Sequence, residues 1–270
     1  MRETPGYIPN PEAKPYSADG TAGGTLWESR TPPNKYCENP RTVKSVRGFS
    51  AFRLSSMRYD LVIFDNDGVL VDSEPISNRL LAGYLTELGH PTSYEESLRD
   101  YMGAAMHRVH DLVEERTGQR LPDDFDEVFH ARVFAAFERE LKPVAGAVDV
   151  LERLVADGVP YCVASSGSHE RIRVGHRTTG LDEWFEEEWV FSSEDVGRGK
   201  PAPDLFLYAA ERMGVVPEKC VVVEDSPLGV QAAVAAGMDV YGFTAMTPAE
   251  RLSGAKQLFG DMRELVGLLL

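Results

Sequence analysis

The sequence has few cysteines, fewer basic than acidic residues, and no long apolar run. Its three cysteines, Cys37, Cys162 and Cys220, are too far apart for a disulfide framework or a thiolate metal site. No apolar stretch approaches the length of a membrane span, and the N-terminus lacks the apolar core of a secretory signal. We therefore expect a cytoplasmic protein in which Cys162 and Cys220 are buried, reduced thiols.

The charge balance is acidic. The chain has 28 lysines and arginines against 43 aspartates and glutamates, so its net charge is −15. An acidic surface argues against binding to nucleic acid or to anionic membranes, although a local basic pocket is compatible with it. We expect no nucleic-acid partner and no membrane partner, and the sequence does not indicate an oligomeric state.

Residues 1–56 differ in composition from the rest of the chain. They contain seven prolines and no sustained hydrophobic periodicity, and their 8 basic and 5 acidic residues give them a positive net charge. Such a composition is typical of segments that do not form a packed core. We interpret residues 1–56 as a disordered or non-native leader, with Met57 as the natural start.

From Tyr59 onward the hydrophobic pattern becomes regular. Residues 59–64 form a short β-branched run, as expected of a strand that is buried on both faces. Residues 73–141 have helical periodicity, and strand-like and helix-like segments alternate after them. This alternation predicts a doubly wound, Rossmann-like parallel sheet. We therefore expect an α/β core domain, residues 57–72 and 142–270, with an inserted helical cap domain, residues 73–141.

Individual elements follow from the same patterns. Further strands are expected at residues 160–165, 189–193, 219–226 and 239–243. Helices are expected at residues 75–89, 123–142, 147–158, 203–214 and 229–237.

Polar groups follow the predicted strands. In a parallel α/β sheet, ligands bind beyond the carboxyl ends of the strands, so the residues that follow the strands are expected to lie close together. The GRGKPAPD segment places Lys200 in a loop just before a helix. The residues predicted to meet there are Asp65, Asp67, Ser165, Ser166, Lys200, Glu224 and Asp225.

The carboxylates of this set indicate a metal site. Asp65, Asp67 and Asp225, with Glu224 beside them, would repel one another around one point without a cation. Hard oxygen ligands suit Mg²⁺, which takes one or two carboxylates together with a phosphate oxygen. We therefore expect Mg²⁺ as the cofactor.

The remaining groups indicate phosphoryl transfer. Ser165 and Lys200 carry a hydroxyl and an ammonium that can bind phosphate oxygens. Asp65 is placed to attack phosphorus and to form an aspartyl-phosphate. Asp67 falls on the same side of an extended chain, where it can protonate the leaving oxygen and later activate water.

Four ordered segments carry a family resemblance. The segments FDNDGVLVDSE, VASSGS, GKPAPD and VVVEDSPLG resemble the four motifs of the haloacid dehalogenase superfamily of phosphohydrolases. The closest subgroup contains β-phosphoglucomutase, phosphoglycolate phosphatase and the hexose- and hexitol-phosphate phosphatases. The resemblance covers about residues 59–270. It implies a helical cap, from about Ser73 to Leu141, that closes over the substrate and excludes water.

The resemblance also implies roles for the site residues. It makes Asp65 the nucleophile and Asp67 the acid/base. It implies that Mg²⁺ is bound by Asp65, the backbone carbonyl of Asp67, Asp225 and Glu224, the last directly or through water. It implies Ser165 and Lys200 as the phosphate ligands, with Ser166 nearby.

The residues at three positions bear on which activity of this superfamily the chain has. The carboxylic acid at Asp67 favours phosphoryl transfer over dehalogenation, because a halide leaves without a proton. The β-phosphoglucomutases carry a histidine and an arginine where this chain has Ser77 and Met106. We therefore predict a Mg²⁺-dependent phosphatase that acts on a small phosphorylated metabolite, a sugar or polyol phosphate. A phosphomutase and a non-enzymatic protein that binds a phosphorylated ligand stay open as alternatives.

Three neighbouring residues are expected to have minor roles. Asn66 departs from the apolar residue that is usual between the two aspartates, and we expect it to form a local hydrogen bond. His169 and Arg171 are expected to belong to a solvated helix start.

Overall fold

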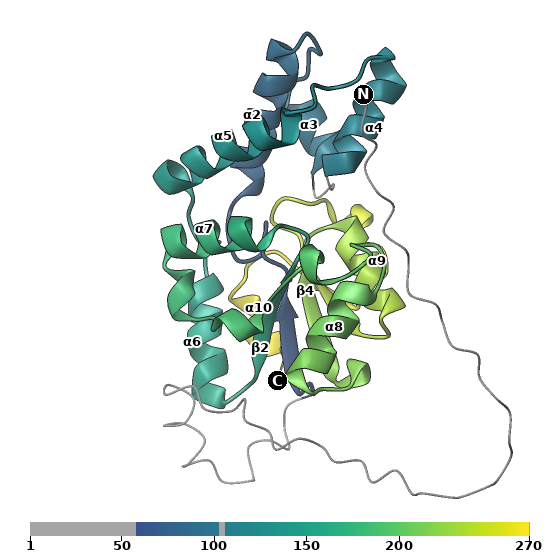
Figure 1. Cartoon of the computed structure of the whole chain (residues 1–270). Coiled ribbons are helices and arrows are strands. Elements are labelled where there is room, and N and C mark those ends of the chain that lie inside the picture. Colours follow the sequence, from purple (N-terminus) through teal and green to yellow (C-terminus); the bar gives the residue numbers. More distant parts are fainter. Residues whose placement is uncertain (1–57, 103–105, 270) are drawn as a thin grey trace, which may run out of the picture. The chain divides into compact units, whose positions relative to one another are not determined.

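A parallel sheet of six strands forms the centre of the computed structural model, which describes residues 58–102 and 106–269 (Figure 1). Across the sheet the strand order is β3-β2-β1-β4-β5-β6, and all neighbouring strands are parallel. The strands are β1 (Leu61–Phe64), β2 (Tyr161–Ser165), β3 (Val190–Ser192), β4 (Cys220–Glu224), β5 (Asp239–Phe243) and β6 (Gln257–Phe259).

Strand β1 lies in the middle of the sheet and is buried along its whole length. Ile63 is in register with Cys162 of β2 on one side and with Val222 of β4 on the other. Helices cover both faces of this sheet, so the strand needs apolar side chains on both sides rather than an alternating pattern. The continuous apolar run of residues 61–64 meets this requirement.

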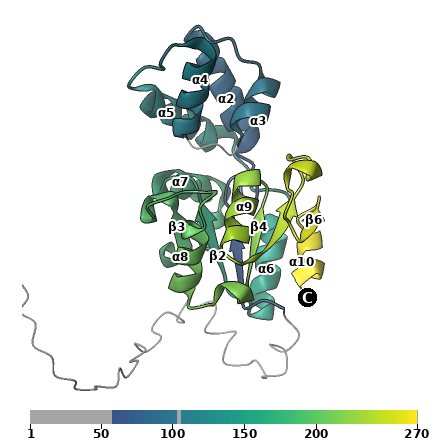
Figure 2. The same cartoon turned by 90° about the vertical axis from the view of Figure 1, so that its right-hand side faces the viewer.

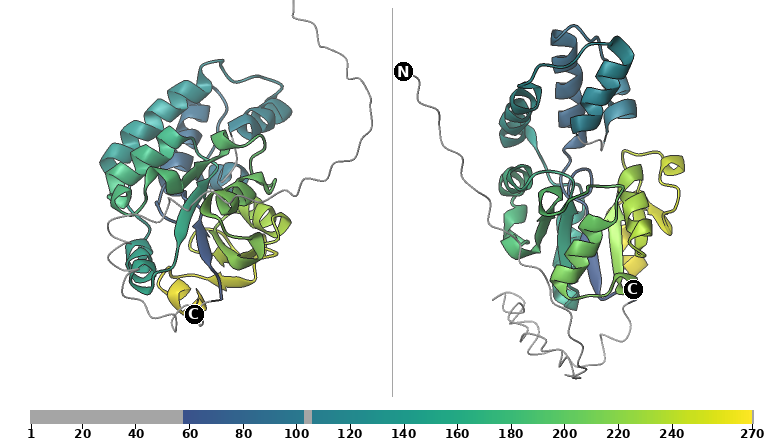
Figure 3. Two further views of the ribbon diagram at one scale, coloured as in Figure 1. Left: turned by 60° about the horizontal axis from the view of Figure 1, so that its bottom comes forward. Right: turned by 45° about the vertical axis from the view of Figure 1, so that its right-hand side comes forward.

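Helices pack on both faces of the sheet (Figure 2). Phe206 of α8 belongs to one apolar cluster with Ile63, and Leu151 of α6 belongs to the cluster that contains Val62 on the opposite face. Figure 3 shows the same layers from two further directions. The α-helices of the described part are α2 (Glu74–Glu87), α3 (Tyr94–Tyr101), α4 (Met106–Thr117), α5 (Phe125–Glu140), α6 (Ala147–Asp157), α7 (His169–Thr179), α8 (Asp204–Met213), α9 (Pro227–Ala235) and α10 (Glu264–Leu269).

The helices α2 to α5 are inserted in the chain between β1 and α6. Tyr84 of α2 stacks on Phe125 of α5 with ring centroids 4.9 Å apart, and both side chains are buried. Ser93 and Glu96 form a capping box at the start of α3. The inserted segment is therefore helical, as expected of a cap, and its boundaries at residues 73 and 141 stay predictions.

The predicted fold class is confirmed, with a few differences in the elements. Each strand and helix expected from the sequence has a counterpart in the described residues. Strand β6 was not expected, because it lies at the edge of the sheet and two of its three residues are exposed, so it has no apolar run. Cys162 and Cys220 are buried free thiols, as predicted.

The predicted leader, residues 1–56, lies outside the described residues. Among the residues that the structure does describe, no helix combines the length and the apolar character needed to cross a membrane.

Candidate active site

Polar side chains from three neighbouring strands meet at one edge of the sheet. Asp65 directly follows β1, Ser165 ends β2 and Glu224 ends β4, and β1 lies between the other two strands. The strands are parallel, so their carboxyl ends share one edge. Lys200, from the loop before α8, reaches the same place.

Lys200 joins two of the carboxylates. Its Nζ donates hydrogen bonds to Asp65 Oδ1 at 2.6 Å and to Glu224 Oε1 at 2.7 Å, and the lysine side chain is only 4% exposed. A third bond, of 3.1 Å, reaches the backbone carbonyl oxygen of Ala164. Burial alone would lower the pKa of Lys200, but the charges of Asp65 and Glu224 outweigh burial and raise it. The lysine therefore stays charged in a buried position.

Three buried carboxylates form a cluster that can hold a metal ion. Asp65, Glu224 and Asp225 each offer an oxygen atom, and these atoms lie within 4.8 Å of one another. Burial and the charge of Glu224 raise the pKa of Asp65 to about 8 against the opposing charge of Lys200. Burial, and then the charge of Glu224, also raise the pKa of Asp225. One lysine cannot neutralise three carboxylates, so the donor set fits a hard divalent cation such as Mg²⁺.

Two glycines make room for this cluster. Gly68 has a φ of +79°, a conformation that favours glycine, and a Cβ atom there would overlap Asp225 Oδ2. A Cβ atom at Gly229, in the first turn of α9, would overlap the carboxylate of Glu224. The close approach of the backbone to the carboxylates therefore depends on the absence of a side chain at both positions.

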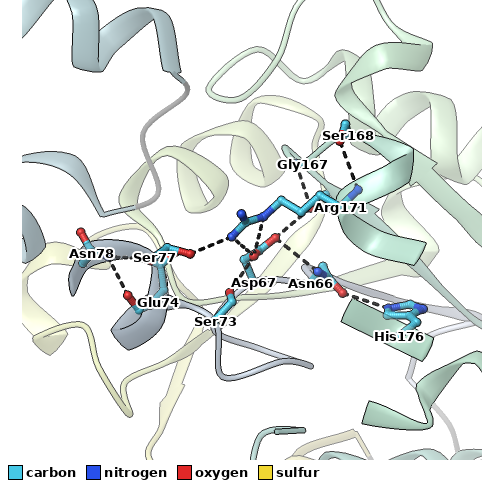
Figure 4. A network of polar contacts seen from close by, with 11 residues as sticks. Asn66, Asp67, Ser73, Glu74, Ser77, Asn78, Gly167, Ser168, Arg171 and His176 are labelled. Carbon is cyan, nitrogen blue, oxygen red and sulfur yellow. Dashed lines mark hydrogen bonds and ion pairs between the residues drawn. The ribbon is translucent and has the colours of Figure 1, made fainter. Parts of the chain in front are cut away.

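Asp67 lies at the same edge, but its carboxylate is held by another set of donors (Figure 4). Asp67 Oδ1 accepts hydrogen bonds from Arg171 Nη2 at 2.7 Å, Arg171 Nε at 3.1 Å and Ser73 Oγ at 2.6 Å. Asp67 Oδ2 accepts bonds from Asn66 Nδ2 at 3.2 Å and from Ser165 Oγ at 3.4 Å. Burial alone would raise the pKa of Asp67, but Arg171 outweighs burial and lowers it to about 2. Asp67 is therefore ionised in this arrangement.

A small hollow unites the residues predicted from the sequence. Its volume is about 40 Å³, enough for a few water-sized groups at about 10–15 Å³ each. It can take an ion with its waters or the oxygens of a phosphoryl group. It is lined by all seven predicted residues, Asp65, Asp67, Ser165, Ser166, Lys200, Glu224 and Asp225, together with Glu74, Met102 and Ser226.

Glu74 is a site residue to which the sequence analysis assigned no role. It is the first residue of α2, it is buried, and its Oε2 accepts a hydrogen bond of 2.7 Å from Asn78 Nδ2. Asn78 Oδ1 in turn accepts a bond from Ser97 Oγ at 2.9 Å. Burial, and then the charge of Asp67, raise the pKa of Glu74 to about 7. The spacing of four residues between Glu74 and Asn78 on a helix is a sequence signal for this pair.

We expect the variant Glu74→Gln to stabilise the metal-free protein in a pH-dependent way. A glutamate whose pKa rises on folding binds its proton more tightly in the folded state, so folding stability falls as pH rises from 4.5 through about 7. Glutamine has no such dependence and can still accept the bond from Asn78. The gain at about pH 8 is on the order of 3 kcal/mol and vanishes near about pH 4.

Thermal unfolding in EDTA at both pH values measures this effect. Glu95→Gln is the matched control, because Glu95 is exposed in the first turn of α3. An equal change in melting temperature for both variants at about pH 8 would contradict the role of burial at Glu74.

Two expectations for neighbouring residues have opposite outcomes. The prediction that Arg171 belongs to a solvated helix start is wrong, because its side chain is 14% exposed and bonds to Asp67. Its partner lies 104 residues earlier in the chain, and no local pattern signals such a pair. The prediction of a local hydrogen bond at Asn66 is confirmed, and its Oδ1 also pairs with His176 Nε2 at 2.9 Å.

Comparisons with known proteins agree with this geometry. Residues 59–237 match the model of a family described as haloacid dehalogenase-like hydrolase. The chain is 33% identical to a 6-phosphogluconate phosphatase of Escherichia coli strain K12, covering 70% of this chain and 84% of the relative. It is 32% identical to hexitol phosphatase A of the same organism, covering 77% of this chain and 94% of the relative.

A solved structure is similar in fold as well as in sequence. It is a hydrolase of the same superfamily from Deinococcus radiodurans with bound phosphate and sodium, with 33% identity and a TM-score of 0.66. The match covers 79% of this chain and 96% of that protein. These comparisons confirm the predicted family resemblance, and the two phosphatases agree with the predicted class of phosphoric monoester hydrolase.

Proposed function

Because this chain belongs to the haloacid dehalogenase-like hydrolase family, we propose that it is a Mg²⁺-dependent phosphatase of a small sugar or polyol phosphate. The observation that carries the proposal is the buried trio of Asp65, Glu224 and Asp225, with Lys200 bridging the first two. Such a site can accept an anionic phosphoryl group only when a cation offsets its carboxylates. The relatives named 6-phosphogluconate phosphatase and hexitol phosphatase support the substrate class.

The residues of the hollow divide into metal ligands and phosphate ligands. Asp65, Glu224, Asp225 and the backbone carbonyl of Asp67 would hold Mg²⁺, which when bound offsets the charge on the phosphoryl oxygens. The hydroxyls of Ser165 and Ser166 and the ammonium of Lys200 would bind phosphate oxygens.

Asp65 carries the first chemical step of the proposed mechanism. A carboxylate oxygen of Asp65 attacks phosphorus, and the new P–O bond forms as the bond to the sugar oxygen breaks. The leaving oxygen takes a proton from Asp67. Asp67 is ionised before substrate binds, so it has to take up this proton from solvent as the negatively charged phosphate arrives, and the second step returns a proton to it from water.

Asp67 carries the second step, which releases the product. Its ionised carboxylate takes a proton from a water molecule, and the water oxygen attacks the phosphorus of the aspartyl-phosphate. The bond between phosphorus and Asp65 breaks, which frees inorganic phosphate and restores the carboxylate. The pairing of Asp67 with Arg171 favours the ionised form that this step requires.

A phosphomutase has less support than a phosphatase. The mutases of the resembled subgroup carry a histidine at the position of Ser77 and an arginine at the position of Met106. Here Ser77 Oγ accepts a hydrogen bond from Arg171 at 3.0 Å, and Met106 packs against the apolar core. Neither residue can supply the imidazole or the guanidinium of a mutase.

Phosphate release from a panel of substrates tests the proposal. We expect 6-phosphogluconate, hexitol phosphates or hexose phosphates to be hydrolysed when Mg²⁺ is present, and EDTA to abolish the release. Renewed addition of Mg²⁺ restores turnover, since the carboxylates need a cation to accept the substrate. Release that is insensitive to EDTA, or the absence of any release, would contradict the proposal. Conversion of a hexose 1-phosphate to its 6-phosphate would identify a mutase instead.

A further inference from the structure

Arg171 is a buried cation to which the proposed mechanism assigns only an effect on the charge of Asp67. It belongs to the first turn of α7, and it does not line the hollow that the seven predicted residues share. Its guanidinium forms two hydrogen bonds to the same oxygen, Oδ1 of Asp67. Asp67 is the residue to which both proton transfers are assigned.

The contacts of Arg171 fix the guanidinium in one place. The group lies over the ring of Phe137, with its carbon 4.8 Å from the ring centroid. A Cβ atom at Gly167 would lie 3.0 Å from Arg171 Cδ, so the glycine leaves space for the arginine stem. Burying an arginine away from water costs free energy that one ion pair rarely returns in full. A contribution to stability alone therefore does not explain why Arg171 lies beside Asp67.

The second contact of Arg171 leads to the inserted helices. Its Nη2, which bonds to Asp67, also donates to Ser77 Oγ in the first turn of α2 (Figure 4). The guanidinium thus links α7, the segment after β1 and the first inserted helix.

A further chain of hydrogen bonds supports the other carboxylate oxygen. Burial lowers the pKa of His176 to about 4, so its imidazole is neutral near neutral pH. In that form His176 Nε2 can donate to Asn66 Oδ1, and Asn66 Nδ2 donates to Asp67 Oδ2. Both oxygens of Asp67 are therefore held from outside the hollow, which fixes the plane of the carboxylate.

We propose that Arg171 is a positioning residue that holds the Asp67 carboxylate for attack of water on the aspartyl-phosphate, and that Ser77 anchors Arg171 for this purpose. The inference rests on the proposed function. In this step Asp67 takes the proton of water, the P–O bond to water forms, and the bond between phosphorus and Asp65 breaks. A base that must lie within hydrogen-bond reach of one water loses rate when its carboxylate can rotate.

Rapid mixing of the Mg²⁺-loaded protein with p-nitrophenyl phosphate separates the two half-reactions. Release of p-nitrophenolate reports the phosphorylation of Asp65, which needs little help from an acid because the phenolate leaves without a proton. Release of inorganic phosphate reports the hydrolysis of the aspartyl-phosphate. A slow second half-reaction appears as a burst of p-nitrophenolate.

We expect Arg171→Met to slow the second half-reaction by about 10²-fold, the cost of a misplaced catalytic group. The first half-reaction stays close to that of the unmodified protein, so a burst near one equivalent of enzyme appears. Arg171→Lys restores part of the rate. Arg173→Met is the matched control, because Arg173 is 56% exposed on the same helix and faces Glu187 at 3.7 Å; it leaves both half-reactions unchanged.

Ser77→Ala keeps the inference testable if Arg171→Met does not fold. It removes one acceptor of Arg171 and leaves the pair with Asp67, so we expect a severalfold slower second half-reaction and again a burst. Equal slowing of both half-reactions, or a rise in KM alone, would overturn the positioning role. If the unmodified protein releases no phosphate, the proposed function fails together with this inference. Normal activity in the unmodified protein and in all variants overturns the inference alone.

Discussion

Replacing Asp65 with asparagine is expected to abolish phosphate release, with a loss in kcat of about 10⁴-fold or more, as for other catalytic nucleophiles. The amide of asparagine has the shape of the carboxylate but cannot form the acyl-phosphate. Its oxygen can still accept the hydrogen bond that Lys200 donates to Asp65 Oδ1. The variant should therefore fold normally, and its activity should fall for chemical reasons alone.

Steady-state release of phosphate, together with circular dichroism, measures this result. Asp72→Asn is the matched control, because Asp72 lies in the same segment and is exposed. It should retain the activity of the unmodified protein. Binding of inorganic phosphate in the presence of Mg²⁺ should survive in the Asp65 variant, which separates a catalytic role from a binding role. Substantial turnover by Asp65→Asn would mean that another group forms the covalent bond.

Replacing Lys200 with methionine should lower both stability and activity. The Lys200 ammonium is the cation that bridges Asp65 and Glu224, and the side chains of all three residues are buried. Removing one partner of a buried ionic group leaves uncompensated charge, which costs about 3–5 kcal/mol. We expect a loss of this order in the free energy of unfolding of the metal-free protein. Activity falls as well, because a phosphate ligand is lost.

A surface pair provides the control for Lys200→Met. Lys256 pairs with Asp239 where both side chains are about one-third exposed, and exposed pairs contribute only about 0–1 kcal/mol. Lys256→Met should therefore change the unfolding midpoint in urea very little. Addition of Mg²⁺ should recover more stability in Lys200→Met than in the unmodified protein, since the freed carboxylates bind the cation more strongly. Equal losses in the two variants, or no recovery with Mg²⁺, would contradict this account.

The positions of most residues of the site could be predicted from the sequence, because they follow from a general property of parallel sheets. Asp65, Ser165 and Glu224 each come at the end of an apolar run, and the carboxyl ends of such runs share an edge. Their convergence needs no knowledge of side-chain conformation. Lys200 follows from the same logic once its loop is placed before a helix.

Other features could not be read from the sequence because they depend on contacts between distant elements. Arg171 has the position of a solvent-facing residue in the first turn of a helix, and only the packing of α7 brings it to Asp67. His176 is buried by the same packing and reaches Asn66 across 110 residues of chain. Strand β6 depends on its pairing with β5, since its own residues are largely exposed.

The two glycines that approach the carboxylates have a consequence for directed evolution of this scaffold. At Gly68 and Gly229 any added carbon would overlap the carboxylates of Asp225 and Glu224, so these positions tolerate no diversity. Gly83, in α2, has open space where its Cβ would lie and accepts alanine without a clash. A mutant library built on this scaffold can therefore leave positions 68 and 229 fixed, whereas position 83 can be varied.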